Sequence, residues 1–335
     1  MGLQIGDIVP RKEIKFEELN GKIIAVDAFN AVYQFLSSVR QPDGTPLMDS
    51  KGRITSHLSG LFYRNIALLS EGIKLVYVFD GEYNPLKRKT HEIRQEAKDI
   101  AKDKFRTALE EEDIEAMAKY SRGFVKLDKE MIKESKELLE AMGIAVMQAP
   151  GEGEMQCAEL VKTGKAYAVG SQDYDALAVG GKRLIQNLTL SRKRKTPSGF
   201  VYISPEIIEY ERILNELGID SDQLICLAIL VGTDFNPGGI KGIGPKKALA
   251  LVRQKKYPVQ IFKEVEERLD FNWQEVFEIF KKPNVNKENI NFPKLNEDKV
   301  KEILVKEHNF SLERIENSLN KLKEVKKESA QKKLF

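Results

Sequence analysis

Five short runs of nearly unbroken apolar residues place the strongest constraint on how this chain can fold. They span residues 22–26, 74–79, 144–147, 166–169 and 183–185. Unbroken rather than alternating apolar residues are typical of strands buried on both faces, as in a parallel sheet covered by helices. Helical patterns at 58–69, 131–142 and 154–162 lie between the runs. We therefore predict an α/β fold with a mostly parallel central sheet and helices on both faces.

Length and residue usage exclude several other classes of protein. The longest clean apolar run, residues 224–231, has eight residues, whereas a membrane-spanning helix needs about 20. The N-terminus lacks the charged and then apolar pattern of a signal peptide. Two cysteines and three histidines argue against a disulfide framework, a structural zinc site and an iron–sulfur cluster. We expect an intracellular protein with no membrane partner.

Acidic residues follow the predicted strands at the points where the strands end. They are Asp27, Asp80, the pair Glu152 and Glu154, and the pair Asp173 and Asp175, with Asp234 after the apolar helix at 224–231. In an open parallel sheet the ligand site lies outside the carboxyl ends of the strands. An Asp after a strand is more often a turn or helix-capping residue, so the signal is the whole set and no single member.

Crowded carboxylates stay ionised only when cations neutralise them, and oxygen-only ligands suit Mg²⁺ or Mn²⁺. Two such ions about 4 Å apart can activate a water and stabilise the leaving oxygen of a phosphodiester. Asp173 and Asp175 face the same way if their segment is extended. Glu152 and Glu154 reach one site together only from non-helical backbone. The set predicts a two-metal phosphodiesterase centre.

A glycine-rich segment, residues 239–248, carries a second signal. Gly242, Gly244 and a proline lead into a helix that begins with Lys246 and Lys247. Backbone amides at a helix N-terminus bind phosphate, and glycines allow close approach, so the segment reads as a hairpin between helices that grips a DNA backbone without reading bases. The alternative is an ordinary Gly-Pro turn that caps a helix.

The stretch from 87 to 104 holds seven Lys and Arg against four Asp and Glu. Lys87 and Arg94 lie seven positions apart, so they share a helix face and can contact a scissile phosphate. The alternative is a solvated helical insertion with no role, as most charge runs are. A further basic run at 192–195 is expected to be a solvated loop or a general phosphate contact.

Taken together, these motifs resemble the flap endonucleases of archaea and eukaryotes, with a length that suggests the archaeal form. The resemblance rests on Met1–Leu3, Val26–Ala28 with Tyr33–Leu36, Val78–Gly81, Ala149–Glu154, Ser171–Asp175, Gly232–Asp234 and Gly242–Pro245. It implies a structure-specific nuclease of DNA replication and repair with a fold of the PIN or 5′-nuclease type. Such an enzyme removes 5′ flaps by hydrolysing one phosphodiester at the branch, leaving a 5′-phosphate and a 3′-hydroxyl, and has 5′–3′ exonuclease activity.

The resemblance also implies roles for named residues. The seven carboxylates match the ligands of two Mg²⁺ ions, with Mn²⁺ as a substitute, and Lys87 and Arg94 match the contacts to the scissile phosphate. Tyr33 matches an aromatic on which an unpaired base stacks. The insertion at 84–130 matches a helical arch through which the 5′ strand passes. The hairpin matches a duplex-holding site that often binds K⁺ through backbone carbonyls, and Gly2 is expected near the active site once Met1 is removed.

Two segments depart from the family pattern. Residues 236–240, Asn-Pro-Gly-Gly-Ile, carry an extra residue and lack the usual Ser of the K⁺ hairpin. At the C-terminus, Gln331, Leu334 and Phe335 begin a motif for binding a sliding clamp, but the sequence stops before its aromatic pair. The alternative for this tail is a plain lysine-rich end.

We expect a nuclease domain at 1–272, with the arch at 84–130 and a helix-turn-helix-type DNA-binding hairpin at 220–265. A helical extension at 273–328 is expected to pack on this core, followed by a partner-binding tail at 329–335. The predicted partners are branched DNA and the clamp, and the protein is expected to be a monomer in the cytoplasm of an archaeon, or in the nucleus if it is eukaryotic.

Two rival functions remain at the level of the sequence. Asp173 and Asp175 superficially resemble an aspartyl-phosphate phosphotransferase of the haloacid dehalogenase type, but that pair would follow the first strand, and here it follows the fourth. A DNA-junction scaffold that binds the clamp without catalysis is the other rival. Such a protein would be expected to have lost carboxylates, and this sequence has all seven.

Overall fold

The computed structural model describes residues 3–41, 43–189, 193–196 and 199–331 of the 335 residues. A seven-stranded sheet lies at the centre, in the order β1-β9-β6-β5-β2-β3-β4. Its strands are β1 (Lys12–Glu13), β2 (Ile23–Asp27), β3 (Lys74–Phe79), β4 (Ala145–Gln148), β5 (Ala168–Gly170), β6 (Arg183–Gln186) and β9 (Glu206–Glu209). A separate hairpin pairs β7 (Lys193–Thr196) with β8 (Gly199–Tyr202).

The five predicted strands are β2 to β6, and all of their pairings with one another are parallel. Two further strands extend the sheet antiparallel: β9 pairs with β6, and β1 pairs with β9. The apolar pattern of the sequence does not predict these two strands. The reason is that β1 is two exposed charged residues and β9 is Glu-Ile-Ile-Glu, so neither carries an apolar run. The sheet is therefore mostly parallel, as predicted.

Side chains of the central strands alternate between two apolar clusters, one on each face of the sheet. The cluster on one face includes α1 (Ala28–Ser38), α2 (Ser56–Ser70) and α5 (Lys129–Ala141), with α14 (Leu312–Gln331) packed on α2. The cluster on the other face includes α6 (Gly153–Lys162), α7 (Asp175–Ala178), α8 (Tyr210–Leu217) and α9 (Ser221–Val231), and α10 (Pro245–Lys255), α11 (Pro258–Lys263) and α12 (Trp273–Lys281) pack on α9. Within the described residues, no helix has both the length and the apolar character needed to cross a membrane.

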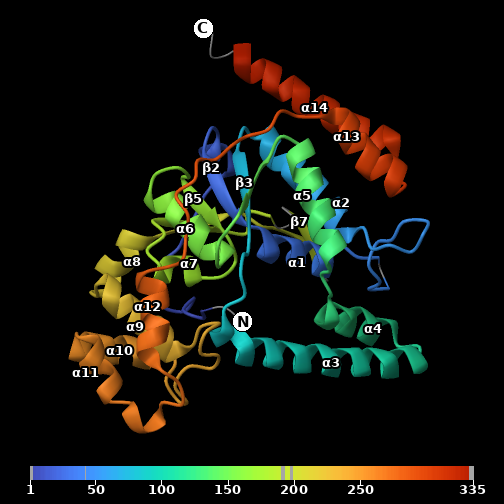
Figure 1. The fold of residues 1–335 in the computed structure, drawn as a ribbon. Coiled ribbons are helices and arrows are strands. Elements are labelled where there is room, and N and C mark those ends of the chain that lie inside the picture. Colours follow the sequence, from blue (N-terminus) through green and yellow to red (C-terminus); the bar gives the residue numbers. More distant parts are fainter. Residues whose placement is uncertain (1–2, 42, 190–192, 197–198, 332–335) are drawn as a thin grey trace.

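One long helix leaves this layered body. The short helix η2 (Pro85–Lys87) leads into α3 (Arg88–Glu110), in which only Thr90 and Ala108 are buried. Figure 1 shows α3 projecting from the body, with α4 (Ile114–Tyr120) folded back beside it. The turn η3 (Ser121–Phe124) then returns toward α3, where Phe124 packs edge-on against Phe105. This is the charged, solvent-exposed insertion that the sequence predicts.

The start of the insertion is fixed beside the end of the neighbouring strand β4. The backbone N–H of Gly81 donates to the carbonyl of Gly151 at 2.6 Å, and that of Glu82 donates to Pro150 at 3.1 Å. A Cβ at Gly81 would lie 2.1 Å from the carbonyl oxygen of Ala149, so only glycine fits there. The chain therefore enters the insertion from a fixed position, and it returns to the core at α5.

The C-terminal part of the chain returns across the molecule to the first face of the sheet. After α12 the chain runs without regular structure until α13 (Glu297–Lys301), and Gln156 holds it through paired hydrogen bonds to the backbone of Asn286, 3.0 and 2.7 Å long. The helical turn η5 (Glu302–Glu307) follows, and α14 buries Ile315 and Leu319 beside α2.

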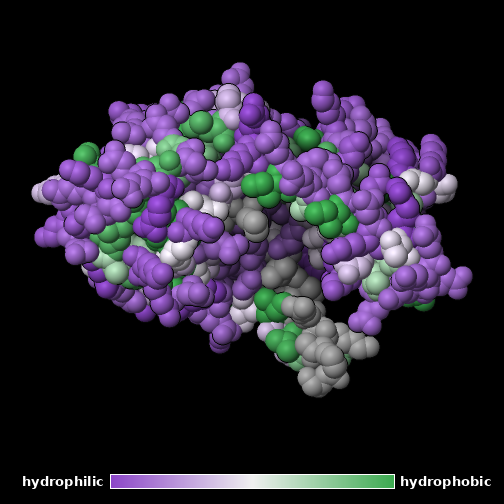
Figure 2. All heavy atoms as spheres, turned by 90° about the horizontal axis from the view of Figure 1, so that it is seen from below, coloured by the Kyte–Doolittle hydropathy of each residue, from purple (hydrophilic) through white to green (hydrophobic). Residues whose placement is uncertain are grey.

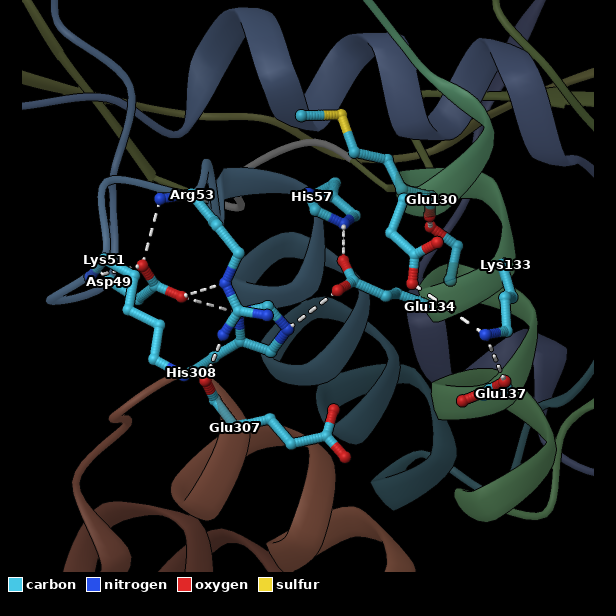
Figure 3. A network of polar contacts seen from close by, with 12 residues as sticks. Asp49, Lys51, Arg53, His57, Glu130, Lys133, Glu134, Glu137, Glu307 and His308 are labelled. Atoms are coloured by element: carbon cyan, nitrogen blue, oxygen red, sulfur yellow. Dashed lines mark hydrogen bonds and ion pairs between the residues drawn. The ribbon is translucent and has the colours of Figure 1, made fainter.

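A buried polar network joins this C-terminal part to the core (Figure 3). The Nδ1 atom of His308 lies 3.1 Å from Oδ2 of Asp49, and Nε2 lies 3.0 Å from Oε1 of Glu134. The other oxygen of Glu134 lies 3.5 Å from Nε2 of His57. Arg53 holds Asp49 through a 2.7 Å bond, and the side chains of His308, His57 and Asp49 are fully buried.

The geometry favours a protonated His308, because a neutral imidazole has one N–H to offer and two carboxylates face this ring. The hydrogen bond to Glu134 raises the pKa of His308, against burial and against the charge of Arg53. Burial alone would raise the pKa of Glu134, but hydrogen bonds from His308 and His57 lower it to about 2. The network is thus an ion triad that fastens the chain after η5 to the segment before α2 and to α5.

We expect this triad to make stability depend on pH. The pKa of His308 is raised in the folded protein, so this residue contributes fully to the free energy of unfolding below its unfolded pKa of about 6.5. That contribution is lost as the pH rises through the pKa of His308 in the folded protein. Breaking a buried pair leaves uncompensated charge, so His308→Gln should lower the free energy of unfolding by about 3 kcal/mol below pH 6.5.

Urea unfolding between pH 5.5 and 9.5 measures this, with His91→Gln on the exposed surface of α3 as the matched control. The difference between wild type and His308→Gln should shrink as pH rises, while the control follows wild type. A difference that stays constant across the range would contradict a protonated His308.

Candidate active site

The carboxylates collect where the order of the strands reverses. The chain passes from β2 to β3 to β4 along one side of the sheet, and then crosses to β5 on the other side of β2. Ligands bind at such a switch point, outside the carboxyl ends of the strands. Asp27 ends β2 and caps α1, where its Oδ1 accepts the backbone N–H of Asn30 at 3.1 Å.

Two carboxylates meet the start of α6. Asp80, directly after β3, accepts the N–H of Gly153 at 2.7 Å through its Oδ1. Glu152 caps α6 from extended backbone, with φ −74° and ψ 128°, whereas Glu154 already belongs to its first turn. The expectation of non-helical backbone is therefore right for Glu152 and wrong for Glu154, because α6 begins between them. The side chain of Glu154 instead accepts the N–H of Ala176 at 3.2 Å.

The second acidic pair lies on the loop after β5. Asp173 accepts a 2.9 Å hydrogen bond from the side chain of Asn30, and Asp175 accepts the N–H of Leu3 at 3.3 Å. The backbone between them is not extended as expected, because Tyr174 has helical angles and Asp175 begins α7. The two carboxylates nevertheless interact. Burial is the main cause that raises the pKa of Asp175 to about 7, and the negative charge of Asp173 is the second.

Burial and mutual repulsion raise the pKa values of most of the cluster. Burial first, and the charge of Asp80 second, raise the pKa of Asp27 to about 8. Burial and then Asp175 raise the pKa of Glu154 well above its usual value. The pKa values of Asp80, Asp173 and Glu152 shift upward as well, with burial as the main cause. Such a group of buried acids is costly unless positive charge is supplied.

Two basic residues from the start of the insertion supply part of that charge. Lys87 forms an ion pair with Glu152, and its Nζ lies 3.7 Å from Oδ2 of Asp234. Arg94 donates to both oxygens of Asp234, at 2.8 and 2.7 Å. Lys87 and Arg94 are predicted to share one helix face; in the structure Lys87 ends η2 and Arg94 lies in α3, yet both side chains reach Asp234. Thr90, which no sequence motif marks, donates to the carbonyl of Asp234 at 2.6 Å.

The donor set fits divalent metal ions by its chemistry. All of its ligating atoms are oxygens, and the Oδ1 atom of Asp175 is buried without a hydrogen-bond partner among the described residues. In the part of the chain that the structure describes, no three acidic, histidine or cysteine side chains already surround one point as a finished ligand set. Lys87 and Arg94 instead neutralise Glu152 and Asp234 directly.

A hollow of about 380 Å³ lies beside the cluster, between α1 and the base of the insertion. Tyr33, Lys98, Arg122 and Gln172 are among the residues that line it. The ring of Tyr33 is 38% exposed, and the Lys98 ammonium lies 5.7 Å from its centroid. Figure 2 views the molecule from the side on which α3 lies, and hydrophilic side chains cover most of that face.

The glycine-rich segment forms the turn between α9 and α10, as predicted for a helix-turn-helix arrangement. Gly242 has φ +80°, Gly244 caps α10 and Pro245 is its first residue. Lys246 and Lys247 are exposed, and Lys247 donates to the carbonyl of Gly242 at 3.1 Å. Because Asp234 lies in the same inter-helix segment, 232–244, the turn is joined directly to the carboxylate cluster.

The unusual residues of this segment have a structural role. Asn236 donates to the carbonyl of Ile229 at 2.7 Å and accepts the hydroxyl of Thr233 at 2.7 Å, which fastens the segment to the end of α9.

At the C-terminal end of the chain, Gln331 is the last residue of α14. Gly2, Arg192, Leu334 and Phe335 lie outside the described residues.

Comparisons with known proteins agree with this geometry. The XPG N-terminal domain matches residues 4–101, and the XPG I-region matches residues 143–234. A sheet of this topology, with acids at its switch point in both matched regions, defines a nuclease of the XPG class.

Flap endonuclease 1 of Pyrococcus furiosus is 51% identical over 334 residues, which cover 99% of this chain and 97% of that protein. Flap endonuclease 1 of Saccharolobus solfataricus is 46% identical over 336 residues, covering 98% and 96%. The structure of flap endonuclease-1 from Methanococcus jannaschii superposes with a TM-score of 0.77 at 40% identity, covering 97% of this chain and 98% of that one. The chain belongs to the flap endonuclease family. The predicted family and fold class are thereby confirmed, and the chain is a nuclease.

We expect the acid cluster to lower stability when no metal is added. In EDTA, Asp175→Asn should raise the melting temperature by about 2–4 °C, because it removes a buried charge that other carboxylates repel. Thermal unfolding in EDTA tests this, with Glu17→Gln on the exposed helix η1 (Phe16–Leu19) as the control. A melting temperature of Asp175→Asn at or below that of the control would show that repulsion between the carboxylates does not lower the stability of the metal-free protein.

Proposed function

We propose that this protein is a structure-specific 5′ flap endonuclease that hydrolyses one phosphodiester near the base of the flap in replication and repair. The observation that carries the proposal is the buried carboxylate cluster at the strand ends, faced by Lys87 and Arg94 from the start of the insertion. Family membership supports the reaction. The catalytic core of Rad2, with a TM-score of 0.69 at 25% identity and 96% of this chain covered, is described in complex with DNA substrate.

Two Mg²⁺ ions, or Mn²⁺ in their place, are the proposed cofactors. The seven proposed ligands, direct or through water, are Asp27, Asp80, Glu152, Glu154, Asp173, Asp175 and Asp234. When bound, such ions supply a hydroxide nucleophile near neutral pH and charge stabilisation for the leaving oxygen. The protein holds Asp80 by the N–H of Gly153 and Glu154 by that of Ala176, so the acids keep fixed directions.

Lys87 and Arg94 are the proposed contacts to the scissile phosphate. Both already point at carboxylates of the cluster, so a phosphate brought to the same place meets two donors without moving them far. One guanidinium nitrogen of Arg94, Nη2, donates to both carboxylate oxygens of Asp234, and charge-assisted bonds of this kind also bind phosphate oxygens. Their positive charge would stabilise the negative charge that grows on the phosphate oxygens.

The insertion from 84 to 130 is the proposed arch over the 5′ strand. The ring of Tyr33, which lines the hollow beside α1, is the proposed stacking surface for an unpaired base, and Lys98 and Arg122 are proposed contacts to its phosphates. An arch that admits a free 5′ end would also allow 5′–3′ exonuclease activity.

The segment from 220 to 265 is the proposed grip on duplex DNA. Gly242, Gly244, Lys246 and Lys247 present backbone amides and ammonium groups to phosphates without reading sequence. Lys247 already contacts the carbonyl of Gly242, so a cation suits this turn, and K⁺ bound by backbone carbonyls is part of the proposal.

For the remaining organisation we propose a nuclease domain at 1–272, a helical extension at 273–328 and a partner-binding tail at 329–335. Gln331, Leu334 and Phe335 would contact a sliding clamp. The protein would act as a monomer with the genome in the cytoplasm of an archaeal cell. The scaffold alternative is not favoured, because a junction-binding protein has no need to hold buried acids against repulsion.

The direct test is cleavage of a labelled double-flap DNA with Mg²⁺ and with EDTA. Wild type should cut near the flap base only with metal. Asp175→Ala should lose several kcal/mol of transition-state stabilisation, which is about 10³-fold in rate, while it still binds the junction. Glu17→Ala serves as the surface control. Binding without cleavage under any metal would support the scaffold alternative, and neither binding nor cleavage would refute the proposal.

The role of Lys87 can be separated from general charge on the insertion. Lys87→Met should lower the single-turnover rate by about 10²-fold, since it removes a charge aimed at the reacting phosphate. Lys89→Met is the matched control, because Lys89 lies two residues away, is 60% exposed and pairs with Asp270. Equal losses in the two variants would assign Lys87 a general electrostatic role.

A further inference from the structure

Asn30 connects the ends of two neighbouring strands at the centre of the carboxylate cluster. It is the third residue of α1, and its backbone N–H donates to Asp27 at 3.1 Å. Its side-chain Nδ2 donates to Oδ2 of Asp173 at 2.9 Å, and its Oδ1 accepts the N–H of Gln172 at 3.4 Å. Asp27 ends β2 and Asp173 follows β5, so one residue holds an acid from each side of the switch point.

The side chain must be an amide to do this. An amide donates through nitrogen and accepts through oxygen at the same time, and it carries no charge. Because the N–H of Gln172 donates to the amide oxygen of Asn30, the amide nitrogen faces Asp173. A carboxylate in the same place would repel Asp173, and an alanine would leave it without this donor.

The helix that carries Asn30 also carries Tyr33, three residues further on and therefore on the same side. Both residues line the hollow beside the cluster, together with Gln172. The helix α1 therefore positions Asp173, through Asn30, and it also carries the Tyr33 ring on which an unpaired base is proposed to stack.

We propose that Asn30 is a positioning residue of this active site. Its amide sets the direction of the Asp173 carboxylate, and its backbone sets that of Asp27, so that both acids face the metal ions in one arrangement. This inference rests on the proposed metal-dependent function. Partners that orient metal ligands typically change metal affinity or activity by about 10–100-fold when they are removed.

The test is Mn²⁺ binding to the DNA-free protein, measured by isothermal titration calorimetry for wild type, Asn30→Ala, Asn30→Asp and Ser38→Ala. Ser38 is an exposed residue at the end of the same helix, so Ser38→Ala controls for an alanine in α1. Asn30→Ala should bind Mn²⁺ about 10–100-fold more weakly than this control. In double-flap cleavage it should need a correspondingly higher Mg²⁺ concentration for half-maximal rate, and excess Mn²⁺ should restore part of the rate. Junction binding in EDTA should stay within about twofold of wild type.

Asn30→Asp separates positioning from packing, because it keeps the size of the side chain. A packing role predicts that Asn30→Asp is milder than Asn30→Ala in Mg²⁺ requirement, whereas positioning predicts that it is as severe or worse. Thermal unfolding shows that each variant is folded. Mn²⁺ affinity and Mg²⁺ requirement of Asn30→Ala equal to those of Ser38→Ala would overturn the inference. Failure of wild type itself to bind Mn²⁺ or cut the flap would instead overturn the proposed function.

Discussion

Repulsion between buried acids is the constraint on which the rest of this molecule depends. A parallel sheet whose strand order reverses brings its acid-bearing ends to one place, and burial makes each negative charge there more costly. Three backbone or amide donors, from Gly153, Ala176 and Asn30, fix the acids in direction. Lys87 and Arg94 add positive charge from outside the sheet. These contacts hold the acids in place, but Lys87 and Arg94 do not neutralise all of them. The cluster can therefore accept further positive charge, which a metal-dependent nuclease requires of its active site.

The same balance of charge ties distant parts of the chain to the cluster. Asp234 comes from the segment between α9 and α10, yet it is held by Arg94 and Thr90 at the start of α3. The proposed arch and the proposed duplex grip therefore meet at one carboxylate. If DNA binds the turn at Gly242 as proposed, a change in its position can be transmitted to the acids, because Asp234 and Gly242 belong to the same inter-helix segment.

The sequence was sufficient for the five parallel strands and for bringing the acids to one edge, because long apolar runs and acids after them are local signals. It was insufficient where structure depends on partners far along the chain. The strand β9 has no apolar run of its own and forms because β6 offers an open edge. Asn30 looks like an ordinary helix residue until Asp173 is placed beside it, and His308 looks like a surface residue until Asp49 and Glu134 close around it. The fold and family were thus readable from local pattern, while the residues that orient or fasten others were not.

The anchoring of both ends of the insertion in the core has an evolutionary consequence. The segment before it is held at Gly81 by Gly151, and the segment after it begins α5, whose Leu138 and Leu139 are buried, so the residues between form a loop whose ends are held by the core. Beyond Arg94, which pairs with Asp234, such a loop can lengthen, shorten or exchange its helices over generations without displacing Asp80 or Glu152, at a loop-closure cost that grows only slowly with length. Selection can therefore alter the outer part of the proposed arch while the acids at the strand ends stay in place, which separates changes in the insertion from changes in the acid cluster.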